Sequence, residues 1–138
     1  MTTFVDSSVL LDVLVSDPSF GDLSESALKQ ARSKGRLVVC EAVVAEIRPA
    51  LSSDAELIEF CEDVGLEFEP CSFEAAMLAG SIYSRYLANA GTTKRVLPDF
   101  LIAAQARQKE YALLARDRGY YREYFEGIDV IDPSKAAT

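Results

Sequence analysis

Four acidic residues, Asp6, Glu46, Asp99 and Asp117, occupy positions where side chains could carry chemistry. Asp6 and Asp117 each follow a short apolar run typical of a strand, whereas Glu46 and Asp99 belong to segments typical of helices. The chain contains no histidine, so carboxylates must carry any acid–base or metal chemistry. Carboxylate oxygens suit hard cations such as Mg²⁺ or Mn²⁺. The set therefore predicts a hard-cation site.

Each acid also has an ordinary structural interpretation. Asp6 suits the N-cap of the helix that follows it, and Asp99 lies in a first helical turn, where negative charge is favourable. Asp117 stands in an Asp-Arg-Gly sequence that suits a turn. Glu46 could be a solvated helix residue that pairs with a neighbouring arginine. The prediction of a site therefore rests on all four residues facing one crevice.

The elements that must position these acids alternate along the chain. Strands are expected at Thr3–Val5, Leu37–Val39, Leu66–Glu69, Tyr111–Ala115 and Ile128–Ile131. Helices are expected at Ser7–Val15, Leu23–Ser33, Glu41–Arg48, from the cap Ser53 to Val64, Phe73–Ala90, Leu97–Lys109 and Tyr120–Phe125. This alternation predicts an α/β fold, a three-layer α/β/α sandwich around a central, mainly parallel sheet. We expect one domain over residues 1–133 and a frayed tail over residues 134–138.

The predicted sheet would bring the acids together. Ligands bind outside the carboxyl ends of the strands in an open parallel sheet. Asp6 ends the first strand and Asp117 follows the fourth, so both point into one crevice if those strands are neighbours. Asp99 lies in the first turn of its helix, and Glu46 projects from a helix that starts just past a strand end, so both could reach the same place.

Composition limits the class of protein. The hydrophobic fraction of 49% predicts a globular chain, whereas the net charge of −8 and the pI of about 4.5 argue against general nucleic-acid affinity. The N-terminus lacks the features of a signal peptide, and no apolar run is long enough to span a bilayer. Cys40, Cys61 and Cys71 show no disulfide or zinc spacing. We therefore expect a cytoplasmic protein with buried thiols and no membrane association.

Four segments in order resemble the motifs of the PIN-domain family, in particular the VapC-type toxins of bacterial and archaeal toxin–antitoxin pairs. The segments are Phe4–Leu11, Val43–Ile47, Pro98–Ala106 and Leu113–Tyr120. They contain the four acids in the order and spacing of the family, over nearly the whole chain. One departure is Ala115, at a position where the family often carries a threonine two residues before its fourth acid.

The resemblance implies metal-dependent hydrolysis of RNA phosphodiester bonds, with Mg²⁺ or Mn²⁺ as cofactor. Asp6 and Asp99 would then be the primary metal ligands, and Glu46 would be a further ligand or would orient the attacking water. Asp117 would complete the site. Ala115 removes a possible hydroxyl partner, which weakens the assignment for Asp117.

RNA needs positive charge beside these carboxylates. Candidate substrate-binding residues are Ser7, Arg95, Arg116 and Arg118, with Lys94 and Arg122 as further cations and Tyr120 and Tyr121 as stacking rings. The ordinary interpretation of these arginines is a solvated, salt-bridged surface.

The resemblance also implies a small antitoxin partner and a homodimer. The segments Leu51–Val64 and Phe73–Ala90 carry apolar side chains that could form such surfaces or could pack into the core of the monomer. Two alternatives to a toxin ribonuclease remain. One is a PIN-like interaction module with a weak or inactive metal site. The other is a phosphatase with Asp6 as nucleophile, but phosphatases of the haloacid-dehalogenase type need a second aspartate at the position that Ser8 occupies here.

Overall fold

The computed structural model describes residues 1–90, 96–117 and 119–135. Its strands are β1 (Thr2–Val5), β2 (Arg36–Val39), β3 (Leu66–Phe68), β4 (Ala112–Leu114) and β5 (Val130–Ile131). Its helices are α1 (Ser7–Leu14), α2 (Gly21–Lys34), α3 (Glu41–Ile47), α4 (Asp54–Val64), α5 (Phe73–Ala90), α6 (Leu97–Lys109) and α7 (Tyr120–Tyr124), with a 3₁₀ turn η1 (Arg48–Ala50). The observed bounds agree with the expected ones to within two residues at every end.

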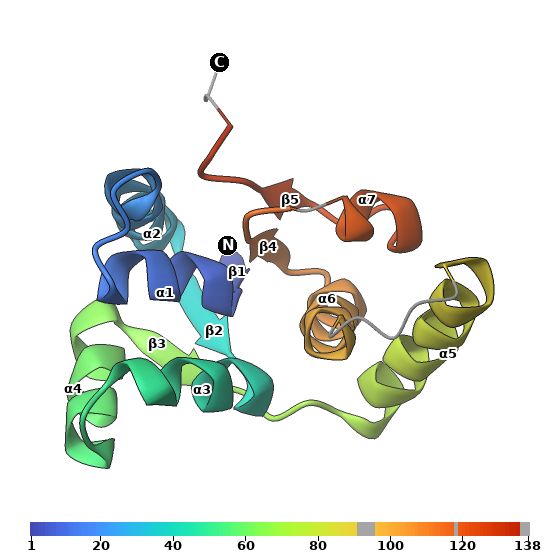
Figure 1. Ribbon diagram of the computed structural model, residues 1–138, viewed down its shortest axis with the longest axis horizontal. Helices are drawn as coiled ribbons and strands as arrows, with labels where there is room; N and C mark the ends of the chain where they lie inside the picture. The colour runs from blue at the N-terminus through green and yellow to red at the C-terminus, as the bar shows by residue number, and fades with distance from the viewer. Residues whose placement is uncertain (91–95, 118, 136–138) are drawn as a thin grey trace.

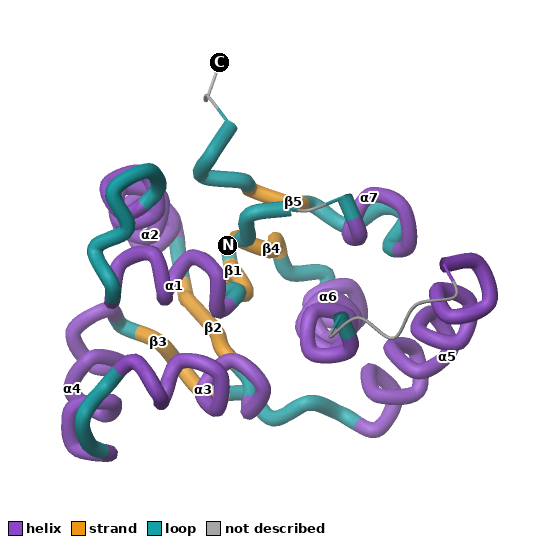
Figure 2. Tube along the Cα trace, viewed as in Figure 1, coloured by secondary structure: helices purple, strands orange, loops and turns teal. Residues whose placement is uncertain are grey.

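The five strands form one parallel sheet in the order β3-β2-β1-β4-β5. Figure 1 shows α1 and α2 on one side of the sheet and α5 and α6 on the other, and Figure 2 shows the short strands enclosed by helices. The expected α/β/α arrangement with a parallel sheet is confirmed. The first strand, β1, lies at the centre of the sheet between β2 and β4.

The sheet is covered on both faces, which explains why the central strands β1, β2 and β4 are buried along most of their length rather than on alternate residues. Phe4 and Val5 of β1 and Leu113 and Leu114 of β4 are fully buried. The helix α6 packs against β1 and β4. Its fully buried residues are Phe100, Ile102, Ala103, Ala104 and Ala106. Small alanine side chains let this helix lie close to the sheet.

Local sequence signals set the helix ends. The Ser53 hydroxyl accepts a hydrogen bond from the Glu56 N–H at 3.1 Å and caps α4, and Gly65, with φ of 84°, ends that helix in the left-handed conformation. The expected stop before Pro49 is displaced by one residue. The α-helix ends at Ile47, and the proline is accommodated in the 3₁₀ turn that follows, where its missing N–H costs no helical bond.

Two further expectations concern the burial of the cysteine thiols and a frayed tail over residues 134–138. Cys40 is buried, as expected, and burial raises the pKa of its thiol, but Cys61 and Cys71 are only half-buried. At the start of the predicted tail, Ser134 donates two hydrogen bonds to Asp132 Oδ1, at 2.9 and 2.6 Å. Residues 136–138 lie outside the described residues. No helix within the described ranges is long and apolar enough to cross a membrane.

Candidate functional site

The site begins where β1 and β4 end side by side. Val5 is aligned with Leu114 in the parallel register, and the Asp6 N–H donates to the Leu114 carbonyl at 2.9 Å. The chain therefore leaves the sheet at Asp6 and at Arg116 on the same edge. This is the position at which a parallel sheet presents a ligand crevice.

Three of the four predicted acids, Asp6, Glu46 and Asp99, line one pocket of about 220 Å³ at this edge. Asp6 follows β1, Glu46 projects from α3, and Asp99 lies in the first turn of α6, which Pro98 opens. Three separate elements thus bring carboxylates to one place. This convergence is not explained if each residue is only a helix cap or only a solvated surface residue.

Two consecutive serines at the start of α1 orient two of these acids. The Ser7 hydroxyl donates to Glu46 Oε1 at 3.0 Å. The Ser8 hydroxyl and N–H both donate to Asp6 Oδ2, at 2.5 and 3.2 Å. Asp6 is therefore both the N-cap of α1 and a wall of the pocket, so its two interpretations hold together.

The pocket destabilises additional negative charge. Glu46 as a whole is exposed, yet desolvation of its carboxyl group raises its pKa, and the charge of Asp6 adds to this, whereas the Ser7 hydrogen bond acts in the opposite direction. Burial also raises the pKa of Tyr121, and the negative charges of the four predicted acids raise it further. The phenol therefore keeps its proton at all ordinary pH values and faces the pocket as a hydrogen-bond donor.

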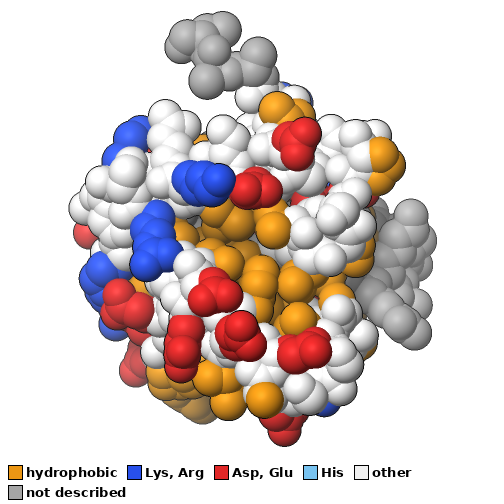
Figure 3. Space-filling view, turned by 90° about the vertical axis from the view of Figure 1, so that its left-hand side faces the viewer, with side chains coloured by type: hydrophobic (Ala, Val, Ile, Leu, Met, Phe, Trp, Pro, Cys, Tyr) orange, Lys and Arg blue, Asp and Glu red, His pale blue; other side chains and the backbone are white. Residues whose placement is uncertain are grey.

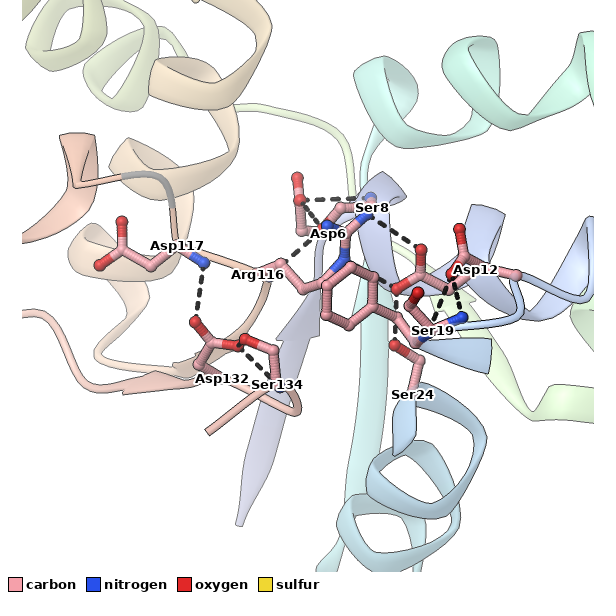
Figure 4. Close-up of polar contacts among 11 residues, drawn as sticks. Asp6, Ser8, Asp12, Ser19, Ser24, Arg116, Asp117, Asp132 and Ser134 are labelled. Carbon is pink, nitrogen blue, oxygen red and sulfur yellow. Dashed lines mark hydrogen bonds and ion pairs between the residues drawn. The ribbon is translucent and has the colours of Figure 1, made fainter. Parts of the chain in front are cut away.

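Asp117 lies near the pocket but does not line it among the described residues. Its Oδ1 accepts the Gly119 N–H at 2.7 Å, and its Oδ2 lies 3.4 Å from Nε of Arg122. The Asp117 N–H donates to Asp132 Oδ2 at 3.1 Å. Figure 4 shows its carboxylate pointing away from Asp6. The turn interpretation therefore describes Asp117 well, and a role for it in metal binding remains a prediction.

The structure also reveals a functional candidate that the sequence analysis missed, the buried carboxylate Asp12. Arg116 Nε donates to Asp12 Oδ2 at 2.8 Å, and Arg116 Nη2 donates to Asp12 Oδ1 at 3.0 Å. The Ser24 hydroxyl donates to Asp12 Oδ2 at 2.8 Å. A signal was present, because Asp12 is the one acid within the apolar run of residues 9–15, and a charge in such a run needs a partner.

The predicted RNA-binding cations and aromatic rings differ in whether they reach the pocket. Arg116 lines the pocket, whereas Lys94, Arg95 and Arg118 lie outside the described residues. Tyr121 is only 3% exposed, so it presents no open ring face on which a base could stack. Tyr120 packs edge-on against other aromatic rings of the core.

The donor set fits a hard divalent cation in chemistry. Asp6, Glu46 and Asp99 offer only oxygen atoms around one pocket, and Mg²⁺ commonly uses one or two carboxylates and completes its coordination with water. Within the described ranges, however, no three acidic or thiol side chains gather closely enough to form a ready-made ligand set. Like charges that share a site repel one another, so we expect water to bridge part of the coordination.

A sequence model described as the PIN domain matches residues 3–126, and no curated protein matches the chain. VapBC2 from Rickettsia felis bound to promoter DNA is similar at a TM-score of 0.71 and 14% identity, over 96% of this chain and 98% of that chain. DNA-bound VapBC from Salmonella typhimurium is similar at a TM-score of 0.69 and 20% identity, over 96% of this chain and 98% of that chain. VapC20 from Mycobacterium tuberculosis, a Sarcin-Ricin loop cleaving toxin, is similar at a TM-score of 0.59 and 12% identity, over 92% of this chain and 98% of that chain. These TM-scores establish a shared fold, and identities this low show nothing beyond the fold.

Proposed function

The chain belongs to the PIN-domain family, and from this premise we propose that it is a metal-dependent endoribonuclease, the toxin of a type II toxin–antitoxin pair. The observation that carries the proposal is the convergence of Asp6, Glu46 and Asp99 on one pocket at the carboxyl ends of the parallel strands. The fold is also that of a protein described as a Sarcin-Ricin loop cleaving toxin. RNA is therefore the proposed substrate and the cytoplasm the proposed location.

The proposed cofactor is Mg²⁺ or Mn²⁺, held by Asp6 and Asp99 with Glu46 as a further ligand. A bound divalent ion supplies Lewis-acid polarisation of a phosphoryl oxygen and lowers the pKa of its water. Ser8 holds the Asp6 carboxylate in one orientation, and Ser7 favours the ionised form of Glu46. Asp117 is proposed to complete the site through the loop that it shapes with Gly119.

Substrate binding must overcome the acidity of the pocket. Arg116 is proposed to face the RNA backbone, because it lines the pocket. Ser7, whose hydroxyl donates to Glu46, is also proposed to contact RNA. Arg95 and Arg118 remain proposed substrate contacts on the basis of sequence alone. Local positive charge of this kind reconciles RNA binding with the pI of about 4.5.

The proposed antitoxin site is an apolar hollow between α1, α2 and α4. Its volume is about 390 Å³. Its apolar lining residues are Val13, Leu28, Phe60 and Val64, and its charged rim residues are Glu25, Lys29, Arg32 and Asp63. Figure 3 shows apolar side chains across this face of the molecule, with basic side chains gathered at the upper left and acidic side chains along the lower part and also beside the basic ones. Two related folds were solved as DNA-bound VapBC complexes, which supports an antitoxin partner here.

The proposed homodimer surface lies on α5. Phe73 and Met77, one helical turn apart, are 74% and 53% exposed. Neighbouring exposed apolar side chains are what a contact surface between two copies would use. On the same helix, Tyr86 is 4% exposed and Tyr83 and Leu87 pack against the core, so the packing alternative holds for these three residues.

One observation favours the second candidate function, an interaction module with a weak or inactive site. Asp117 is engaged by Gly119 and Arg122 rather than facing the pocket, and Ala115 offers no hydroxyl beside it. The module would bind partners without cleaving RNA.

A cleavage assay separates the two candidates. Purified protein is incubated with single-stranded and stem-loop RNA in Mg²⁺, in Mn²⁺ and with EDTA, alongside Asp6→Asn and Asp99→Asn variants. The ribonuclease proposal expects cleavage that EDTA and either substitution abolish. Intact RNA with the wild-type protein in both metals would favour the interaction module, and cleavage that survives EDTA and both substitutions would assign the activity to a contaminant.

A further inference from the structure

The side chain of Arg116 is fixed in place before any substrate arrives. Asp12 holds its guanidinium group through two parallel hydrogen bonds of 2.8 and 3.0 Å, and the ring of Phe20 lies 4.4 Å from its Cζ. The Arg116 N–H donates to Oγ of Ser8 at 3.3 Å. The residue is therefore fixed at both its backbone and its side chain, as Figure 4 shows for the contacts to Ser8 and Asp12.

The partner that holds Arg116 is itself enclosed. Asp12 is 3% exposed, and the Ser24 hydroxyl donates to its Oδ2 at 2.8 Å. A buried carboxylate with one hydrogen-bonded orientation fixes the direction of the guanidinium plane. Three segments of the chain, namely α1, the loop before α2 and α2 itself, contribute side chains that hold this one cation.

This arrangement leaves part of the guanidinium group available. A guanidinium group carries five N–H donors, and the contacts to Asp12 use one on Nε and one on Nη2. Within the described residues, Nη1 donates no hydrogen bond, and the Arg116 side chain is 27% exposed. Donors therefore remain for an anion.

Arg116 also differs in charge from the rest of the pocket. It is the one cation that lines the pocket in the described part of the chain, and it shares the pocket with Asp6, Glu46 and Asp99. The hydroxyl groups of Ser7 and Ser8 donate to two of these acids. A phosphate group that entered the pocket would find its charge complement in Arg116.

We propose that Arg116, held by Asp12, anchors a non-bridging phosphate oxygen of the RNA strand beside the acidic residues. This inference rests on the proposed ribonuclease function and deepens it. Because Asp12 fixes the guanidinium in advance, RNA binding does not have to order a flexible side chain. Asp12 is then a positioning residue that acts through Arg116. The competing explanation is an ion pair that only ties α1 and α2 to the end of β4.

The test measures RNA cleavage in Mg²⁺ across a series of KCl concentrations for the full chain and four variants. They are Arg116→Gln, Arg116→Lys, Asp12→Asn and, as a matched control, Arg107→Gln at the opposite end of α6 from Asp99. Each phosphate contact on a single strand contributes about −0.7 to the slope of log affinity against log salt. The unfolding midpoint of every variant is measured alongside.

We expect Arg116→Gln to raise KM roughly tenfold, the effect of losing one charged hydrogen bond, and to flatten the salt slope by about 0.7. Arg116→Lys keeps the slope but raises KM, because an ammonium cannot bind Asp12 and phosphate in a fixed plane. Asp12→Asn also keeps the slope while raising KM. Arg107→Gln changes neither quantity.

An Arg116→Gln variant that folds and matches Arg107→Gln in KM and salt slope would overturn the inference, leaving a structural ion pair. If Arg116→Gln or Asp12→Asn does not fold, the milder Arg116→Lys and Ser24→Ala variants carry the comparison. Unchanged KM in both of these also overturns the inference. A wild-type protein that cleaves no RNA in Mg²⁺ or Mn²⁺ overturns the proposed function and this inference together. Failure of the inference alone leaves wild-type cleavage intact, so the two failures are distinguishable.

Discussion

Ser7 donates its hydroxyl to Glu46 Oε1 over 3.0 Å and thereby joins the first residue of α1 to α3, 39 positions along the chain. This hydrogen bond favours the ionised carboxylate, whereas desolvation and the charge of Asp6 favour the neutral one. The protonation state of Glu46 thus depends on a hydroxyl from another helix.

Ser7→Ala should move the acidic limb of the pH–rate profile to higher pH. The substitution removes the contact that lowers the pKa of Glu46, so this pKa rises further and the ionised form is lost at a higher pH. The profile of kcat/KM between pH 5 and 9 measures the shift, with Ser52→Ala, whose hydroxyl donates to the carboxylate of Glu56, as the control. An unmoved acidic limb would show that the ionisation of Glu46 does not limit the reaction.

Divalent metal should stabilise the folded protein through Asp6 and Asp99. At a Mg²⁺ or Mn²⁺ concentration 100 times Kd, a ligand that binds only the folded state adds about 2.7 kcal/mol. Differential scanning calorimetry with and without metal should therefore show a higher Tm for the wild type. Asp6→Asn and Asp99→Asn should show little change, and an equal rise in all three proteins would place the metal elsewhere.

Asp12→Ala should destabilise the protein by about 3 kcal/mol, because it leaves the Arg116 guanidinium without its buried partner. Urea unfolding monitored by circular dichroism measures the loss. Asp54→Ala provides the comparison, since it breaks an equally short but exposed pair with Arg48, which contributes less than about 1 kcal/mol. Similar losses in both variants would contradict a special role for burial.

Asp117→Asn should reduce cleavage less than Asp6→Asn does. The asparagine oxygen can still accept the Gly119 N–H and keep the turn, and the Asp117 carboxylate does not line the pocket. Initial rates of the two variants at saturating Mg²⁺ decide the matter. Complete loss of activity in Asp117→Asn would instead make this residue a metal ligand equal to Asp6.

Phe60→Glu should prevent antitoxin binding while leaving cleavage intact. The side chain lies in the apolar hollow between α1, α2 and α4, away from the lining of the acidic pocket. Co-expression with a VapB-like antitoxin followed by affinity purification measures binding, and the free variant is assayed for RNA cleavage. Retained binding would move the antitoxin to another face of the molecule.

The fold was predictable because its signals are local. Apolar runs, capping residues such as Ser53 and the glycine at position 65 each act within a few residues, and every expected element was found. The convergence of Asp6, Glu46 and Asp99 was also predictable, since the carboxyl ends of parallel strands share one edge.

The rest of the site depends on contacts between distant parts of the chain. Asp12 and Arg116 are 104 positions apart, and no periodicity in the sequence pairs them. The orientation of Asp117 likewise depends on Asp132 and Arg122. Ala115 is fully buried beside this loop, so the absence of a hydroxyl there could be read from the sequence but its effect on Asp117 could not.

The central place of β1 has a consequence for the timing of synthesis. Its partner β4 begins at Ala112, and Arg116 comes later still, so the ribosome must release most of the chain before the pocket can close. At roughly 5–20 residues per second, the interval between the synthesis of Asp6 and of Arg116 is on the order of 10 s. The proposed nuclease therefore leaves the ribosome with an incomplete site, since its nascent N-terminal half holds Asp6 and Glu46 but neither Asp99 nor Arg116.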